Sequence, residues 1–183
     1  MEMGLRFSEL AALTWEKVNY AERTLTVDCQ APLDYERSED DPQTFINNGR
    51  QAIDHMKAYE NPRVLYLTDE VIEILHKMEE FDKSLYESPE KGIEKNARIF
   101  PEGNFRYHTY NDKIKQAAED IGLERDDYRT HSLRATAATM LYRKCRDIKT
   151  VQYFLGHTTP EMTSKYIKQV EMVETLKKAL ETV

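Results

Sequence analysis

Apolar residues recur every three or four positions along much of the chain, a spacing typical of helices that bury one face. Asp147 and Gly156 bracket one short apolar segment as an N-cap and a C-cap. Thr159, Pro160 and Glu161 then supply a cap, a first-turn proline and a first-turn acid. The predicted helices are a GLRFSELAALTW helix that begins at or before Met1, one opened by Thr68, one from Thr109 or Asn111 to about Ile121, one from the HSLR tetrapeptide to about Lys144, the 147–156 helix, and a last one from Thr159.

Three short stretches predict a small antiparallel sheet. Residues 24–28 (TLTVD) are rich in Thr and Val, which favour strands. Residues 51–58 (QAIDHMKA) and 63–67 (RVLYL) are expected to be the second and third strands, joined across residues 59–62. Residues 31–49 are polar and acidic with several breakers, so they predict a long loop. The expected fold class is α+β, mainly helical, with a three-stranded antiparallel sheet.

The length of the chain and its two ends suggest one domain with a helical tail. A chain of 183 residues is long enough for a single domain with a real core. We expect residues 1–170 to form that domain and residues 171–183 to form an amphipathic C-terminal helix. Because the first predicted helix begins at or before Met1, we also expect sequence upstream of it to be missing. The apolar positions of the tail are Met172, Leu176, Leu180 and Val183.

The composition excludes several classes of protein. Hydrophobic residues make up 40% of the chain and charged residues 32%, which is ordinary for a soluble globular protein. No apolar run approaches the length of about 20 residues that a membrane span needs, and the N-terminus lacks the pattern of a secretory signal. Two cysteines, Cys29 and Cys145, cannot form a disulfide framework. We therefore expect a cytoplasmic protein with reduced thiols and no membrane partner.

The net charge of −7 argues at first against a nucleic-acid partner, but the charge is unevenly distributed. Residues 129–168 hold eight basic and two acidic side chains, so this stretch carries 8 − 2 = +6. A local basic face matters more to a phosphate backbone than the global sum. On charge alone, a solvated basic helix face is an equally good interpretation. The basic residues are Arg129, Arg134, Arg143, Lys144, Arg146, Lys149, Lys165 and Lys168.

Two arginines, two histidines and a late tyrosine suit one kind of chemistry. Arg6 and Arg134 could clamp the non-bridging oxygens of a phosphodiester, because a guanidinium is a planar fork that stays charged. His131 and His157 can donate hydrogen bonds or move protons near neutral pH. Tyr166 is a weak nucleophile at its free pKa of about 10, so it needs such surroundings. The set predicts attack of a tyrosine on DNA without a metal or another cofactor.

The product of this attack would be a phosphotyrosine, and a general acid must protonate the sugar hydroxyl that leaves. Lys57, at the end of the predicted second strand, could supply that proton if its ammonium reaches the leaving oxygen. Lys77 and Lys83 are available elsewhere as alternatives. Because the phosphotyrosine retains the bond energy, another strand's hydroxyl could reverse the step and rejoin DNA without ATP.

Structural explanations exist for each of these residues taken alone. Arg6 could pair with Glu9 or Glu2 on a helix surface, since ion pairs three or four residues apart are common. Tyr166 is one of eleven tyrosines and could be an ordinary packed side chain. The remaining histidines lack metal-ligand spacing and are expected to be structural or to lie at the surface. They are His55, His76 and His108.

The ordered set of motifs resembles the catalytic domain of the tyrosine recombinases, the phage integrase family. GLRFSELAALTW is similar to the family's first arginine motif, MKAYENPRVLYLTDEV to its lysine hairpin, HSLR to its H-x-x-R, and LGH with a tyrosine nine residues later to its nucleophile region. The resemblance covers residues 4 to about 170. It implies a supporting acid at Glu9 and a catalytic set of Arg6, Lys57, His131, Arg134, His157 and Tyr166.

The resemblance implies a site-specific recombinase of a phage or mobile element that cuts and rejoins double-stranded DNA. Four copies would act together on DNA, with the C-terminal helix docking on a neighbour. The family's usual helix before the first arginine motif and its core-binding domain are absent from this sequence, and residues 31–49 look longer and more acidic than the usual link. Two alternatives stay open: a type IB-like topoisomerase, and a non-catalytic DNA-binding remnant of an integrase.

Overall fold

The computed structural model describes residues 3–37, 40, 45–51, 57–85, 94–100 and 106–181. Its internal contacts divide the chain into two units. One unit combines Met1–Arg6 with Asn111–Val183, and the other is Phe7–Tyr110. The first is helical and the second holds the sheets, so the predicted α+β, mainly helical class is confirmed.

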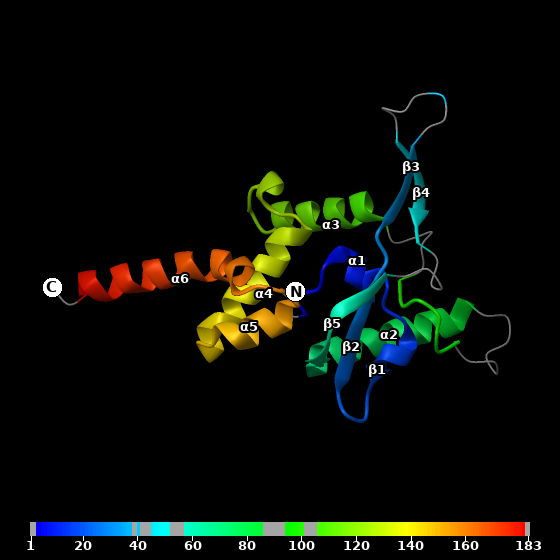
Figure 1. The fold of residues 1–183 in the computed structure, drawn as a ribbon, viewed down its shortest axis with the longest axis horizontal. Helices are drawn as coiled ribbons and strands as arrows, with labels where there is room; N and C mark the ends of the chain where they lie inside the picture. The colour runs from blue at the N-terminus through cyan, green and yellow to red at the C-terminus, as the bar shows by residue number, and fades with distance from the viewer. Residues whose placement is uncertain are drawn as a thin grey trace. The chain divides into compact units, whose positions relative to one another are not determined.

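A three-stranded antiparallel sheet organises the Phe7–Tyr110 unit (Figure 1). Its strands are β1 (Val18–Asn19), β2 (Thr24–Gln30) and β5 (Lys57–Tyr66), in the order β1-β2-β5. Alternate side chains at residues 25–27 of β2 and 63–65 of β5 point into the core, as the twofold period of a strand requires. The buried members are Leu25, Val27, Arg63 and Leu65.

The predicted three-stranded sheet is therefore confirmed, but two of its strands were assigned wrongly. Residues 57–58 and 63–66, which come from the two runs expected on either side of residues 59–62, belong to one strand, β5, rather than to two. Ala58 pairs with Cys29 of β2 and Arg63 pairs with Val27, and the register shifts between these two pairs. Pro62 lies within this irregular stretch of β5. Proline has no N–H to donate to a neighbouring strand, so it is tolerated in a β-bulge as well as in a turn. The third strand is instead the short β1.

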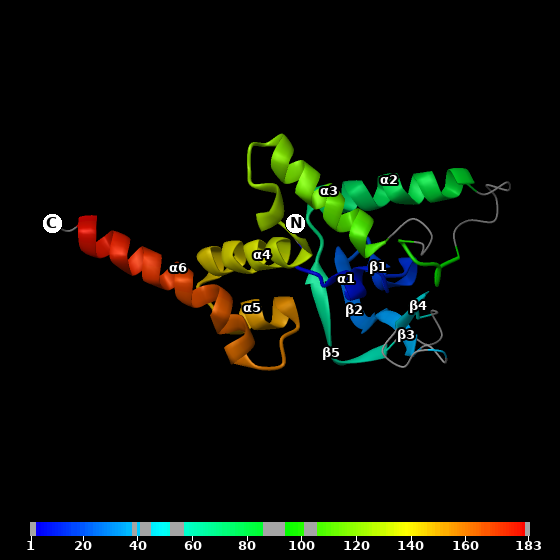
Figure 2. The same ribbon diagram turned by 90° about the horizontal axis from the view of Figure 1, so that it is seen from above.

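The predicted loop at residues 31–49 is wrong, because much of it forms a second, two-stranded sheet. Strand β3 (Leu33–Arg37) pairs antiparallel with β4 (Phe45–Arg50), as Figures 1 and 2 show. The breaker at Gly49 adopts a φ of 90° beside a shift in the register of this pair. A glycine that was taken to mark a loop here marks a bulge within a hairpin. Residues 52–56, expected in the second strand, lie outside the described residues.

The first predicted helix is much shorter than expected. Helix α1 covers only Phe7–Leu10, and a 3-10 turn follows at Trp15–Lys17. Gly4 has a φ of 55°, a left-handed conformation that a right-handed helix cannot contain. Helix α2 (Asp69–Leu85) begins after Thr68, whose hydroxyl accepts the N–H of Val71 at 3.5 Å, as its capping pattern predicted.

The other unit is built mainly from helices α4 (Thr130–Cys145), α5 (Ile148–Leu155) and α6 (Pro160–Glu181), which contact one another in all three pairs. Helix α3 (Tyr107–Asp120) begins earlier than predicted, and Gly122, with a φ of 78°, follows its end. The starts and ends predicted for α4 and α5 are confirmed to within a residue. The core that α4, α5 and α6 share consists of Ala138, Tyr142, Val151, Leu155 and Ile167.

The predicted tail is helical, but it continues the helix that carries Tyr166 rather than forming a separate one. Besides the shared core, polar side chains join α6 to α4: Glu171 accepts the hydroxyl of Tyr142, and Glu174 binds the guanidinium of Arg146 through both carboxylate oxygens. The tail also presents apolar side chains to solvent. Met172, Val173, Leu176 and Leu180 are each more than half exposed. No helix among the described residues is long and apolar enough to cross a membrane.

Candidate active site

Arg134 is buried, with only 3% of its surface exposed. It lies on α4, and its guanidinium donates hydrogen bonds to the carbonyl oxygens of Gly4 and Leu155. These two partners lie 130 and 21 residues away in the sequence. Because charged donors to backbone carbonyls make strong bonds, the guanidinium plane is held at two points.

Arg6 converges on the same backbone segment. Its guanidinium lies 3.5 Å from the carbonyl oxygen of Gly156, the residue after Leu155. The last carbonyls of a helix have no partner within the helix and carry a partial negative charge, so the C-terminal end of α5 attracts cations. The two predicted arginines therefore share one anchor, the Leu155 and Gly156 carbonyls of the LGH motif.

The third residue of that motif, His157, contacts the predicted nucleophile. Gly156 ends α5 with a left-handed φ of 62°, and the chain turns so that His157 is buried. The imidazole stacks on the ring of Tyr166, with centroids 5.9 Å apart and planes inclined by 17°. Tyr166 is half-buried on α6 and packs against the core of its unit. Backbone anchors and ring packing thus bring Arg6, Arg134, His157 and Tyr166 to one region.

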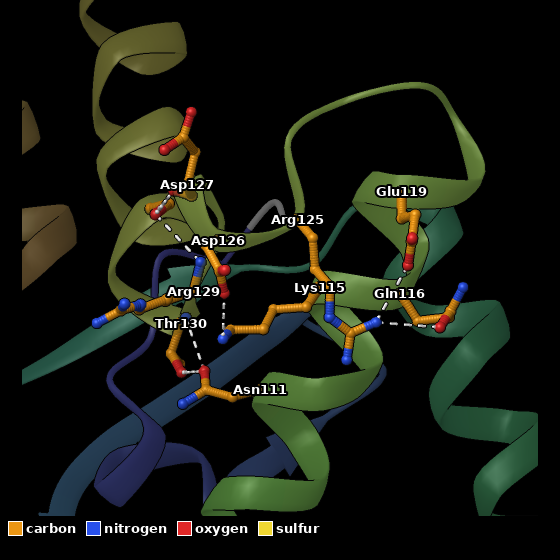
Figure 3. A network of polar contacts seen from close by, with 10 residues as sticks. Asn111, Lys115, Gln116, Glu119, Arg125, Asp126, Asp127, Arg129 and Thr130 are labelled. Atoms are coloured by element: carbon orange, nitrogen blue, oxygen red, sulfur yellow. Dashed lines mark hydrogen bonds and ion pairs between the residues drawn. The ribbon is translucent and has the colours of Figure 1, made fainter.

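His131 is exposed in the first turn of α4, three residues before Arg134. Residues three apart share one face of a helix. The start of this helix is tied to α3, because the side-chain oxygen of Asn111 accepts both the N–H and the hydroxyl of Thr130, at 3.0 and 2.5 Å (Figure 3). In addition, Arg129 donates its N–H to the hydroxyl of Ser132. These bonds fix the turn that presents the imidazole.

Further polar contacts in Figure 3 join α3 to the segment before α4. Lys115 binds Asp126 at 2.7 Å, and its ammonium lowers the pKa of that carboxyl. Arg125 donates to both Gln116 and Glu119 of α3. Gln116, Glu119 and Asp126 are exposed, and Lys115 and Arg125 are partly exposed. We therefore interpret these contacts as support for the segment before α4 rather than as a functional site.

The basic residues of the 129–168 stretch differ in exposure and in their partners. Arg134 is buried with its carbonyl partners, and Arg146 is exposed but paired with Glu174. The remaining basic side chains are exposed on α4, α5, α6 and the segment before α4. They are Arg129, Arg143, Lys144, Lys149, Lys165 and Lys168.

Glu9 and Lys57 belong to the Phe7–Tyr110 unit. Glu9 is fully buried at 0% exposure, and its two carboxylate oxygens accept the guanidinium of Arg63 at 3.2 and 2.9 Å. The predicted supporting acid thus joins α1 to β5. Lys57 is the first residue of β5, and its backbone pairs with Gln30 of β2. The alternatives to it are engaged on α2, where Lys77 binds Glu73 and Lys83 binds Glu79.

Two of the other histidines pack against aromatic rings. His76 stacks on Tyr20 with centroids 4.4 Å apart, and burial, helped by the Glu79 carboxylate, raises the pKa of that tyrosine to about 12. His108 meets the edge of the ring of Tyr107. His55 lies outside the described residues.

Sequence reasoning missed four residues that support the predicted set: Gly4, Arg63, Asn111 and Thr163. Three of them act across long sequence separations, for which a single sequence carries no local pattern. Thr163 is different, because it lies six residues after His157 and its hydroxyl is 2.9 Å from Nδ1 of that ring. A polar side chain one turn before a predicted helical nucleophile was a signal that could have been used.

Comparison with known proteins gives consistent matches. Residues 1–172 match the phage integrase family. A probable integrase/recombinase, YoeC of Bacillus subtilis (strain 168), is 37% identical over 54 residues, which is 30% of this chain and 29% of that protein.

Solved structures of recombinases share the fold. The Tn1549 transposon integrase in complex with transposon right-end DNA gives a TM-score of 0.63 at 17% identity, covering 90% of this chain and 50% of that chain. The XerH site-specific recombinase bound to its difH substrate gives 0.59 at 21% identity, covering 91% and 39%. XerA recombinase gives 0.59 at 20% identity, covering 90% and 48%. The chain thus spans about half, or less, of the length of these proteins.

Proposed function

Because the chain belongs to the phage integrase family, whose match extends over residues 1–172, we propose that it cuts and rejoins DNA through a covalent phosphotyrosine. The observation that carries this proposal is the common anchor of Arg6 and Arg134 beside the stacked pair of His157 and Tyr166. Two guanidinium groups and an imidazole gathered around a tyrosine suit an anionic phosphodiester.

In the proposed reaction the Tyr166 hydroxyl loses its proton to His131 or to solvent water, and its oxygen attacks the scissile phosphorus. A 3′-phosphotyrosine forms while the bond from phosphorus to the 5′-oxygen breaks. Charge on the phosphoryl oxygens grows during this step, and catalysis depends on stabilising it. Arg6 and Arg134 would hold those oxygens. Since Arg134 is already fixed by two carbonyls, it would lose little freedom when the phosphate binds.

The remaining predicted residues have assigned parts in this proposal. Lys57 gives its proton to the 5′-oxygen as the oxygen leaves. His131, exposed in the first turn of α4, and His157 donate hydrogen bonds or move protons at the phosphate. Glu9 supports the site by holding Arg63, rather than by reacting. Reversal of the attack by the hydroxyl of another strand rejoins DNA.

Double-stranded DNA is the proposed partner. The exposed basic side chains of the helical unit suit a phosphate backbone, and contacts of this kind position a protein without reading sequence. The Tn1549 integrase and XerH were each solved with DNA. By analogy, we propose a phage or mobile element as the origin of the protein and the cytoplasm, where such DNA lies, as its location.

We further propose that four copies assemble on DNA and that the C-terminal helix joins neighbours. The tail of α6 leaves Met172, Leu176 and Leu180 on one face, each at least 56% exposed. Apolar side chains spaced four residues apart form a stripe that a partner can cover.

A trapping experiment tests the proposed chemistry. The full-length protein would be incubated with duplex DNA that carries the element's attachment site and a nick, so that the short cleaved strand diffuses away, and then run on a denaturing gel. We expect a protein–DNA adduct that Tyr166→Phe abolishes while DNA binding persists. Tyr153→Phe is the matched control, since Tyr153 is the nearest preceding tyrosine and is 53% exposed. DNA binding without an adduct would refute the proposed activity, and an adduct that survives Tyr166→Phe would refute the assigned nucleophile.

A further inference from the structure

Thr163 is a fully buried polar residue that the chemistry above does not use. It lies on α6, has 0% of its surface exposed, and precedes Tyr166 by three residues, so the two share one helix face. Its hydroxyl lies 2.9 Å from Nδ1 of His157. A buried hydroxyl needs a hydrogen-bond partner, and here the imidazole is one.

The rest of His157 is also fixed by its neighbours. Its N–H donates to the carbonyl of Gln152 at 3.1 Å, and its own carbonyl accepts the side-chain amide of Gln152 at 3.1 Å. With the backbone held on both sides, the orientation of the ring is set by its side-chain torsions. The Thr163 hydroxyl engages one ring edge, and the Tyr166 ring stacks on one ring face.

The hydroxyl of Thr163 differs from three other hydroxyls on the helices of this unit. Thr136, Ser164 and Thr175 each donate to the carbonyl four residues earlier, which is the common choice within a helix. The hydroxyl of Thr163 is directed at an imidazole nitrogen. A threonine can donate its hydroxyl hydrogen to that nitrogen, and a neutral imidazole has one nitrogen that accepts.

We propose that Thr163 is a positioning residue that donates to Nδ1 and thereby keeps the proton of neutral His157 on Nε2. The hydrogen bond at one imidazole nitrogen decides which tautomer the ring adopts. With the proton on Nε2, the neutral ring remains a donor and can bind a phosphoryl oxygen. The functional part of this inference rests on the proposed strand transfer, while the tautomer itself does not.

Nitrogen NMR of the full-length protein, labelled with ¹⁵N-histidine, tests the tautomer directly. The ¹⁵N shifts of a ring distinguish a protonated nitrogen from an unprotonated one, and a His157→Gln spectrum assigns the resonances. Above the pH at which the ring becomes neutral, we expect the proton on Nε2. A proton on Nδ1 in the unaltered protein would overturn the inference, and this outcome does not depend on how any variant folds.

Three variants then test what the hydroxyl contributes. Thr163→Val keeps the shape and removes the hydroxyl, Thr163→Ser restores it, and Thr175→Val removes a hydroxyl from an exposed position of the same helix. We expect Thr163→Val to give a mixture of tautomers and to slow adduct formation roughly 10-fold or more, as loss of an orienting partner commonly does. Thr163→Ser and Thr175→Val should keep the Nε2 tautomer and most of the rate.

The outcomes separate this inference from the proposed function. If Thr163→Val melts like the unaltered protein, and keeps its tautomer and its rate, Thr163 does not position His157. If the unaltered protein forms no adduct, the proposed function fails. The assigned hydrogen bond would still be supported if NMR places the proton on Nε2 and Thr163→Val shifts that tautomer.

Discussion

The carbonyl of Gly4 accepts a hydrogen bond from the buried guanidinium of Arg134, 130 residues later in the chain. Gly4 has a left-handed φ of 55°, and a Cβ built on it would lie 2.5 Å from Cε1 of Phe154. Both the backbone conformation and the close approach of the ring require glycine here. The N-terminal segment is thus held against α5 at the point where Arg134 is anchored.

Gly4→Ala should therefore damage both stability and the arginine anchor. Overpacking against Phe154 together with the strained φ is expected to lower the free energy of unfolding by about 2–4 kcal/mol. Gly122→Ala is the matched control, because Gly122 also has a positive φ (78°) but nothing within 4 Å of the added Cβ. It should lower the free energy of unfolding by only about 1 kcal/mol. Urea titrations measure both values, and equal effects would contradict the proposed clash.

Removing one partner of the buried Glu9–Arg63 pair should cost more stability than replacing both partners. The side chains of Glu9 and Arg63 are 0% and 1% exposed, so water cannot take the place of a missing partner. Glu9→Ala should lower the free energy of unfolding by about 3–5 kcal/mol, because Arg63 is left charged and buried. The double variant Glu9→Leu with Arg63→Met should recover much of this loss.

Thermal melts of these variants provide the measurement. Glu73→Gln serves as the control, since it breaks an exposed ion pair with Lys77 on α2 and should leave the melting temperature within error. A Glu9→Ala protein that melts like the Glu73→Gln protein would show that the buried pair does not hold α1 to β5.

Much of the helical unit could be predicted from sequence because its signals are local. The cap at Asp147, the turn at Gly156 and the proline at Pro160 fixed the bounds of α5 and the start of α6 within one unit. Arg134 of the HSLR motif meets the LGH motif at the carbonyl of Leu155 for the same reason, since a short connection joins α4 and α5.

The predictions were wrong where a contact distant in sequence decides the structure, or where a proline or glycine is compatible with both a turn and a bulge. The sequence around Gly4 has the composition of a helix, and only the Phe154 ring and the Arg134 guanidinium explain why it turns instead. Pro62 predicts a turn, yet it lies in an irregular stretch of β5. Likewise, the strand pattern around Arg63 gives no indication of its pairing with Glu9, 54 residues earlier.

The N-cap of α5 predicts a pH-dependent contribution to stability. The Thr150 hydroxyl and then the N–H groups of Lys149 and Thr150 hold the pKa of Asp147 below its ordinary value. A carboxyl whose pKa is lowered by folding stabilises the fold above its unfolded pKa, about 3.9, and loses this effect as the pH falls through the folded value. The stabilisation should be complete at pH 7 and fade below about pH 4.

Asp147→Ala should consequently lower the melting temperature by about 2–4 °C at pH 7, a loss typical of an N-cap in a protein of this size. The gap should narrow at pH 3, where the carboxyl of the unaltered protein is being protonated. Asp147→Asn keeps an acceptor without a charge, so its melting temperature should depend less on pH than that of the unaltered protein. A gap of the same size at pH 7 and pH 3 would exclude the charge as the cause.

Removal of divalent metal should leave adduct formation unchanged. In the proposed chemistry the phosphoryl charge is met by Arg6 and Arg134 and the leaving oxygen by Lys57, so no step requires a metal ion. The trapping assay would be repeated in excess EDTA, with Arg134→Lys as a variant that keeps the charge but loses the planar fork. We expect no change with EDTA and a loss of roughly 100-fold with Arg134→Lys. A loss in EDTA that magnesium restores would contradict the arginine-based mechanism.

The exposed stripe on the tail of α6 predicts a defect in assembly without a defect in folding. Leu176 and Leu180 are 56% and 75% exposed, so replacing both with glutamine removes little buried area from the chain itself. If a neighbouring copy covers them on DNA, the double variant should weaken assembly while the melting temperature stays within error. Thr175→Gln, on an adjacent face of the same helix, is the control, and none of these changes alters the charge of the protein.

Light scattering and native gels of the protein–DNA complex measure the assembly. Assembly that is equally strong in both variants would rule out the stripe as the contact between copies.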